Sequence, residues 1–167
     1  MIPGPDQVVG SDRSRLDRAR VWAEIDLGRL GENCRRLMEA VAPAGVMAVI
    51  KADAYGLGQG PVARALAKVG VAHFGVATPE EALSLLDAGL PVQILGGVLP
   101  AEIPALVAHD VVLPLTDLPS ARRISQAALR QGRKARVHFK IDTGMGRLGI
   151  PQEAARETLS VAWSLPG

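Results

Sequence analysis

The stretch AVIKADAYGLGQG occupies residues 48–60 and contains the change of pattern on which the fold prediction depends. Its apolar run, 48–50, leads directly into Lys51, and glycines at 56, 58 and 60 precede a segment with helical patterning. A short apolar run followed by a glycine-rich turn and a helix is typical of a β-strand that opens a βαβ unit. Short strand-like runs followed by helical segments recur along the chain, so we predict a series of such units.

Short β-like runs alternate with amphipathic segments from Val21 onward. The predicted strands are 21–25, 46–51, 73–77, 92–96, 111–115 and 136–142. The last five of these begin 27, 19, 19 and 25 residues apart. Strands that alternate with helices predict an α/β fold with a parallel sheet, and the regular spacing favours a (β/α) barrel over a doubly wound sheet.

The segment TPEEALSLLDAG, residues 78–89, contains the clearest helix signal. Thr78 suits the N-cap, Glu81 completes a capping box, and Gly89 suits a left-handed C-terminal position. Further helices are predicted over 27–41, over 117–131 and from about residue 151 onward.

The composition is that of a globular domain and excludes two classes of protein. The 167 residues include 19 Lys and Arg against 17 Asp and Glu, with 48% hydrophobic and 22% charged residues. A disordered chain would be poorer in apolar residues, and a net charge of +2 is too small for a dedicated nucleic-acid binder. No apolar stretch approaches the roughly 20 residues of a membrane-spanning helix. We therefore predict a cytoplasmic protein with no membrane or nucleic-acid partner.

Cys34 is the single cysteine, so it cannot form an internal disulfide. It shares the apolar stripe of the helix predicted over 27–41, which favours a small buried residue over a redox group. His73 and His109 lie at or just before strand starts and are interpreted as structural or surface groups. Because no set of His, Cys and carboxylate residues has metal-ligand spacing, no metal site is predicted.

The chain is predicted to divide into a loosely ordered N-terminal leader, residues 1–20, and about five βα units over residues 21–167. A complete (β/α)₈ barrel of the TIM-barrel type takes about 250 residues. Five units alone would leave an edge strand and an apolar sheet face uncovered, which promotes aggregation. We therefore expect an N-terminal portion of a longer protein, with the barrel present only in part.

Lys51 is a candidate nucleophile because active sites of parallel α/β proteins gather where strands end. An apolar strand behind its amine would withdraw it partly from water, which favours the neutral form that attacks a carbonyl. The alternative is an ordinary lysine that reaches solvent past the strand end. The following glycines are open to two interpretations, an anion cradle or a flexible turn, since they match no established phosphate-binding motif.

The stretch RVHFKIDTGMGRLG, residues 136–149, contains a second candidate group. Alternation places His138, Lys140 and Asp142 on one strand face, which is solvated in an edge strand and interior in a closed barrel. The glycine-rich loop that follows carries Arg147, which can bind a carboxylate or phosphate or simply face solvent.

Three blocks resemble the bacterial alanine racemase family: VWAEIDLGRLGENCRRL from residue 21, AVIKADAYGLG from residue 48 and VHFKIDTGMGRLG from residue 137. The resemblance runs from about Val21 to the end of the chain, with the blocks in the family's order. It implies a homodimer in which each subunit has an N-terminal (β/α)₈ barrel and a C-terminal β domain, the latter absent from these residues. It also implies pyridoxal 5′-phosphate as cofactor.

The resemblance assigns a role to four residues. Lys51 would be the catalytic residue that binds the cofactor as a Schiff base and acts as the base for D-alanine. Tyr55 would contact the cofactor phosphate, and Arg147 would bind the cofactor's phenolic oxygen and the substrate carboxylate. Lys140 corresponds to a lysine that is carboxylated in many members. Leu57 stands where the family often has histidine, which puts any phosphate or dimer contact there in doubt.

The expected function is therefore that of an alanine racemase, an isomerase that supplies D-alanine for peptidoglycan. The family's second base is a tyrosine of the C-terminal domain, and Tyr55 is the only tyrosine here, so the 167 residues alone are expected to be inactive. Three alternatives remain: a barrel that stores or delivers pyridoxal phosphate, a remnant that does not fold, and a cofactor-independent Schiff-base lyase. The block at 137–149 favours the racemase.

Overall fold

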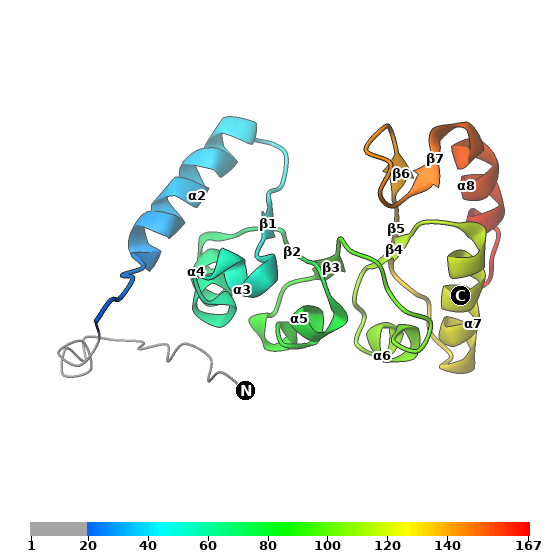
Figure 1. Ribbon diagram of the computed structural model, residues 1–167, viewed down its shortest axis with the longest axis horizontal. Helices are drawn as coiled ribbons and strands as arrows, with labels where there is room; N and C mark the ends of the chain where they lie inside the picture. Colours follow the sequence, from blue (N-terminus) through cyan, green and yellow to red (C-terminus); the bar gives the residue numbers. More distant parts are fainter. Residues whose placement is uncertain (1–19) are drawn as a thin grey trace.

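Five parallel strands follow one another in a row, with helices in the connections between them (Figure 1). The computed structural model describes residues 20–167. Apart from Arg20, the expected leader lies outside the described residues. The arrangement is an α/β fold, as the alternation of strand and helix patterns predicted.

The strands are short. They are β1 (Met47–Val49), β2 (His73–Val76), β3 (Val92–Ile94), β4 (Leu113–Leu115), β5 (Val137–Phe139), β6 (Ile141–Asp142) and β7 (Ile150–Pro151). The helices are α2 (Leu27–Val41), α3 (Lys51–Tyr55), α4 (Gln59–Val69), α5 (Pro79–Leu83), α6 (Ile103–Ala108), α7 (Leu118–Arg130) and α8 (Ala155–Trp163). Two 3₁₀ turns, η1 (Leu86–Ala88) and η2 (Gln152–Ala154), complete the described elements.

The strand order follows the chain order. β1, β2 and β3 form one parallel sheet, and β4 and β5 form a second parallel pair. A parallel bridge between Gln93 and Val112 joins β3 to β4, so the five strands continue in one direction. Their carboxyl ends therefore lie along one edge of the row, which is the edge that carries sites in this class of fold.

The predicted strand at 21–25 is wrong, because this segment has no regular secondary structure. Val21 is 85% exposed and Trp22 is 58% exposed. Alternating apolar and polar residues favour a strand only where a neighbouring backbone can pair with it, and no strand lies beside this segment in the described part of the chain.

The predicted strand at 136–142 is interrupted at Lys140. The Lys140 amide donates to the Leu115 carbonyl at 3.0 Å, and its own carbonyl accepts from the Ile150 amide at 2.7 Å. The backbone therefore leaves β4 and pairs instead with β7, which creates the short strand β6.

Local signals explain where the helices begin. Asp26 caps α2 by accepting from the Arg29 amide at 2.9 Å. The capping box of Thr78 and Glu81 is present as predicted, although α5 ends early and continues as η1 before the left-handed Gly89. The predicted helix at 117–131 is confirmed as α7, with Asp117 as its N-cap.

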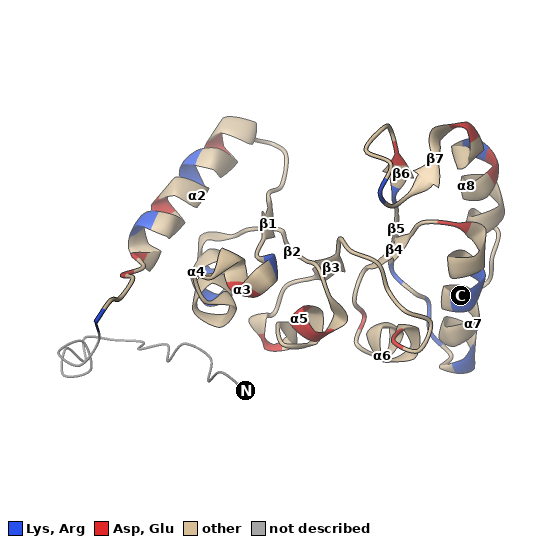
Figure 2. Ribbon diagram, viewed as in Figure 1, with Lys and Arg blue, Asp and Glu red and all other residues tan. Residues whose placement is uncertain are grey.

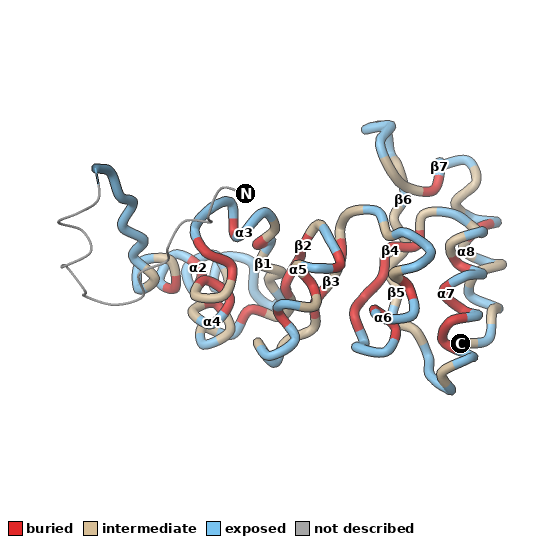
Figure 3. The backbone as a smooth tube through the Cα atoms, turned by 60° about the horizontal axis from the view of Figure 1, so that its bottom comes forward, coloured by how far each residue is buried: buried red, intermediate tan, exposed pale blue. Residues whose placement is uncertain are grey.

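The core lies between the strands and the helices that cover one side of them. Phe74, Val76, Ile94, Leu106 and Leu113 are fully buried. Buried segments in Figure 3 lie in β2, β3 and β4 and in α4, α6 and α7. Acidic and basic side chains occur together on α2 and α8 (Figure 2). No helix within residues 20–167 has the length and apolarity needed to cross a bilayer.

Cys34 is buried on α2, as its place on the apolar stripe predicted. Burial raises the pKa of its thiol, and the nearby charge of Arg35 opposes this only in part. A raised pKa keeps the thiol protonated and unreactive, which agrees with the interpretation of Cys34 as a packing residue.

Candidate functional site

Lys51 lies at the carboxyl end of β1 and is half-buried. Ile50, the residue before it, is only 3% exposed, and its amide donates to the Gly75 carbonyl of β2 at 2.9 Å. The strand therefore holds the backbone up to Ile50, and the lysine is the first residue beyond it. This is the position at which parallel α/β proteins place reactive side chains.

The segment after Lys51 forms a turn of left-handed helix. The φ and ψ angles are 52° and 53° at Ala52, 53° and 46° at Asp53, and 54° and 45° at Ala54, and φ is 57° at Tyr55. A left-handed helical conformation costs roughly 1–2 kcal/mol for each non-glycine residue. Four such residues in succession persist only if other bonds hold them.

The turn is closed by its own backbone and by Asp53. The Ile50 carbonyl accepts from the Ala54 amide at 3.0 Å, and the Asp53 carboxylate accepts from the Gln59 amide at 2.6 Å. The amides of Gly56 and Gly58 donate to carbonyls within the turn. Because these two amides are already used, Gly56 and Gly58 support a turn and not an anion cradle.

Two side chains outside the turn bond to the backbone on either side of Lys51. Glu81 Oε1 accepts from the Ala52 amide at 2.6 Å, and Gln59 Nε2 donates to the Ile50 carbonyl at 3.2 Å. Neither contact was predicted. Glu81 was identified only as part of a capping box, and Gln59 has no signal except that it follows the glycines directly.

Tyr55 ends the left-handed turn with its side chain 63% exposed. Its position four residues after Lys51 places both side chains on the same short element, α3.

Asp142 organises the loop that carries Arg147. Its Oδ1 accepts from the amides of Gly144 and Gly146, each at 3.0 Å. These two hydrogen bonds, with a smaller contribution from the charge of Lys140, lower the pKa of the Asp142 carboxyl. Arg147 itself is exposed.

Gly149 closes this loop at a point where no side chain fits. A Cβ atom there would lie 2.8 Å from the Asp142 nitrogen and 3.0 Å from the Lys140 oxygen, and φ is +137°. The close approach allows β6, which precedes the loop, to pair with β7, which follows it, and Lys140 lies half-buried just before β6.

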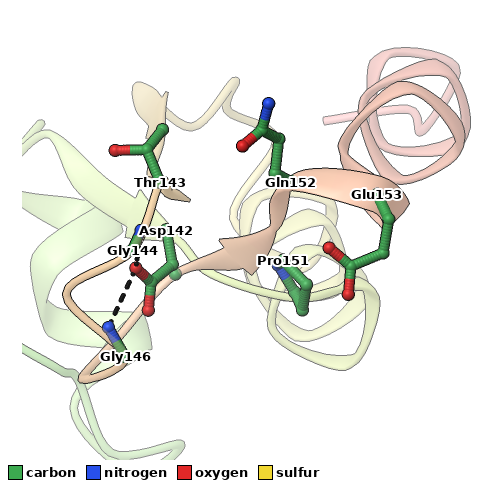
Figure 4. A pocket seen from close by; sticks show the side chains of 8 residues that line it. Asp142, Thr143, Gly144, Gly146, Pro151, Gln152 and Glu153 are labelled. Carbon is green, nitrogen blue, oxygen red and sulfur yellow. Dashed lines mark hydrogen bonds between the residues drawn. The ribbon is translucent and has the colours of Figure 1, made fainter.

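An open hollow lies beside the loop (Figure 4). The residues that line it are Asp142, Thr143, Gly144, Gly146, Gly149, Pro151, Gln152 and Glu153. Two of these are carboxylates and none is a cation, so the hollow is poorly suited to a phosphate. Arg147 does not line it.

The three histidines lie apart from Lys51 along the chain. His73 begins β2, and His109 is the exposed residue that directly follows α6, on the chain segment that leads into β4. His138 Nε2 lies 2.9 Å from the Ile94 carbonyl, within hydrogen-bond distance. Within residues 20–167, no three His, Cys, Asp or Glu side chains gather as a metal site would require.

The predicted site residues fall into two groups along the row of strands. Lys51 and Tyr55 follow β1, whereas Lys140 and Arg147 follow β5. β2, β3 and β4 separate the two groups, and α3 and β6 lie well apart in Figure 1. Both groups nevertheless lie at the same, carboxyl, edge of the parallel strands.

Comparison with known proteins gives one consistent result. Residues 25–167 match the family model described as the alanine racemase N-terminal domain. Alanine racemase of Geobacter sulfurreducens is 45% identical over 143 residues, which are 84% of this chain and 37% of that protein. The chain thus spans less than half the length of this curated relative.

Solved structures agree in fold. Alanine racemase from Streptomyces lavendulae superposes with a TM-score of 0.81 at 35% identity, over 86% of this chain and 38% of the other. Alanine racemase from Bartonella henselae, solved with covalently bound pyridoxal phosphate, superposes with a TM-score of 0.77 at 26% identity, over 85% and 41% of the two chains.

Proposed function

This chain belongs to the alanine racemase family, and we propose that it forms part of an enzyme that interconverts L-alanine and D-alanine with pyridoxal 5′-phosphate. The observation that carries the proposal is Lys51 at the carboxyl end of β1, within the motif AVIKADAYGLG. The proposal includes a cytoplasmic location. A chain with a single cysteine forms no internal disulfide, so its folding requires no oxidising compartment.

We further propose that the row of parallel strands is part of a closed (β/α)₈ barrel. Closure would bring the ends of β1 and β5 to one mouth, so that Lys51 and Arg147 could serve the same ligand. A C-terminal β domain and a second subunit complete this proposal. The support for the further domain is that the chain covers only 37% of its Geobacter relative.

The residues present are chemically suited to pyridoxal phosphate. A half-buried lysine that follows the buried Ile50 can bind an aldehyde through its amine, and the hydroxyl of the exposed Tyr55 can donate a hydrogen bond to a phosphate oxygen. Arg147 supplies a planar cation that can bind a phenolate or a carboxylate. Lys140 lies close enough for its charge to act on Asp142, and carboxylation would make it an anion able to orient Arg147.

Each side chain has a distinct task in the proposed reaction. Lys51 Nζ would hold the cofactor and would move a proton to and from one face of the substrate Cα. Arg147 would orient the substrate carboxylate, and Tyr55 would help fix the phosphate. When bound, the cofactor would supply the electron sink that makes the Cα proton removable. The proton donor for the opposite face would come from outside the described residues.

The test is to replace Lys51 with alanine in the protein that carries this chain. We expect Lys51→Ala to lower D-to-L alanine exchange by about 10²–10⁴-fold or more, the usual contribution of a general acid–base group. Borohydride reduction in the presence of pyridoxal phosphate should label Lys51 in the wild type and leave that peptide unlabelled in the variant. Lys68→Ala, at an exposed lysine of α4, is the matched control. Exchange that persists in Lys51→Ala would refute the assigned role.

A further inference from the structure

The two residues that flank Lys51 are both held by side chains from other elements. On the C-terminal side, the Ala52 amide donates to Glu81 Oε1 of α5 at 2.6 Å. On the N-terminal side, the Ile50 carbonyl accepts from Gln59 Nε2 of α4 at 3.2 Å. The backbone on either side of Lys51 is therefore held by two contacts, which span 9 and 29 residues of sequence.

Glu81 does more than cap α5. Its Oε2 accepts from the amides of Ala77 at 2.8 Å and Thr78 at 3.4 Å, and the Thr78 bond is the one that a capping box requires. Its Oε1 is directed across to Ala52, so each carboxylate oxygen accepts from a backbone donor. A glutamine has one accepting oxygen and an NH₂ group, so it could not accept from the donors on both sides as the carboxylate does.

Gln59 forms the second connection between α5 and the turn. Its side chain is 9% exposed, and its Oε1 accepts from Ser84 Oγ at 2.9 Å. Ser84 directly follows α5, close to one helical turn beyond Glu81. Glu81 acts on the turn directly and Ser84 acts through Gln59, so the α5 region supports the backbone on both sides of Lys51.

These bonds support the left-handed turn where support is needed most. Ala52 is the first of the four residues with positive φ, and right-handed conformations are favoured by sterics at each of them. Loss of the bond from the Ala52 amide to Glu81 would release this first residue.

We propose that Glu81 is a positioning residue for Lys51: by holding the Ala52 amide, it keeps the left-handed turn in place and the Lys51 amine at the carboxyl edge of the strands. The proposal deepens the proposed function and rests on it, since it concerns the lysine that is to bind the cofactor. In this proposal, Glu81 acts through the backbone and does not contact the reacting atoms.

The experiment compares Glu81→Gln with wild type on the full chain. Proteins are incubated with pyridoxal phosphate, reduced with borohydride at successive times, and the labelled lysines are quantified by peptide mapping. A hydrogen bond to a charged group is strong enough that its loss should slow labelling of Lys51 by roughly tenfold, with Lys68 as an unchanged internal reference. Without cofactor, the amide of Ala52 should exchange its hydrogen faster in Glu81→Gln than in wild type.

Two controls separate positioning from helix stability. Glu80→Gln removes a neighbouring exposed carboxylate from α5, and Thr78→Ala removes the hydroxyl cap but leaves Glu81 bonded to Ala52. Neither should slow labelling of Lys51, although Thr78→Ala should lower thermal stability. Gln59→Met preserves volume while removing the bond to Ile50, so it should slow labelling in the same direction as Glu81→Gln.

Each outcome bears on one proposal. Wild-type labelling of Lys51 in Glu81→Gln, or equal slowing by Thr78→Ala, would overturn the positioning role. A wild type that takes no label at Lys51 would overturn the proposed function instead. In that case, faster exchange of the Ala52 amide in Glu81→Gln would still support control of the turn by Glu81.

Discussion

At the scale of single residues, the most unusual feature is the run of positive φ angles from Ala52 to Tyr55. None of these four residues is glycine, and the glycines that follow belong to the exit from the turn. The chain therefore places an unfavourable conformation immediately after the lysine that the proposed function requires. Strain beside a reactive group is common where other contacts over-determine the geometry, and here Glu81 and Gln59 provide such contacts.

Replacing Ala52 tests whether this strain is stored in the folded state. Ala52→Gly should raise the free energy of unfolding by about 0.5–1 kcal/mol, because glycine avoids the left-handed penalty at a smaller cost in chain entropy. Ala52→Val should lower it by about 1 kcal/mol or more, since a branched Cβ tolerates positive φ poorly. Urea denaturation measures both changes.

The matched control for Ala52 lies in an ordinary helix. Ala65→Gly in α4 should lower the free energy of unfolding by about 1 kcal/mol, the usual cost of glycine in a helix interior. Stabilisation at position 52 together with destabilisation at 65 would identify the left-handed turn as the cause. A loss of stability in Ala52→Gly would contradict the interpretation.

At the scale of elements, the loop between β6 and β7 depends on one carboxylate. Asp142 accepts from the amides of Gly144 and Gly146 and so determines the shape of the segment in which Arg147 lies. The pairing of β6 with β7 then holds the two ends of the loop together. Arg147 is therefore presented by a structured loop, although its own side chain is exposed.

The lowered pKa of Asp142 predicts how this loop responds to acid. The ordinary pKa is 3.8 and the folded value lies below it, so the ionised carboxylate stabilises the loop above pH 3.8. That contribution is lost as the pH falls through the folded pKa. Hydrogen exchange of the Gly144 and Gly146 amides should therefore lose protection in this acidic range.

Asp142→Asn should remove this response, because an amide oxygen accepts hydrogen bonds without titrating. Asp87→Asn, in the exposed turn η1, removes one carboxylate elsewhere and should leave the acid response of the loop unchanged. If Asp142→Asn retained the wild-type pH dependence, another group would be responsible.

At the scale of the whole molecule, the row of five strands has two edges. Within residues 20–167, β1 pairs only with β2, and β5 pairs only with β4. Val49 on the edge strand β1 is 38% exposed, and large apolar side chains such as Trp163 are exposed elsewhere. Unpaired backbone and exposed apolar surface favour association with other chains.

We expect the 167-residue chain to self-associate through these edges. Val49→Lys should shift it towards monomer in sedimentation velocity, because a charge on an edge strand opposes pairing. Leu99→Lys, at a loop residue 67% exposed and outside the strands, is the control of the same chemical type. An equal shift with both variants, or none with Val49→Lys, would show that the strand edge is not responsible.

Local patterns in the sequence determined the class of fold, the positions of five strands, the cap of α5 by Thr78 and the place of Lys51 after a strand. These features depend on residues that are close together in the sequence, so they can be predicted without knowledge of the tertiary structure. The strand predicted at 21–25 was wrong because a strand needs a distant partner. The left-handed turn, the bond of Glu81 to Ala52 and the pairing of β6 with β7 were decided only by the tertiary structure. Each of them depends on contacts that the folded chain alone creates: the turn is unfavourable by itself, and it persists because residues from α4 and α5 hold it.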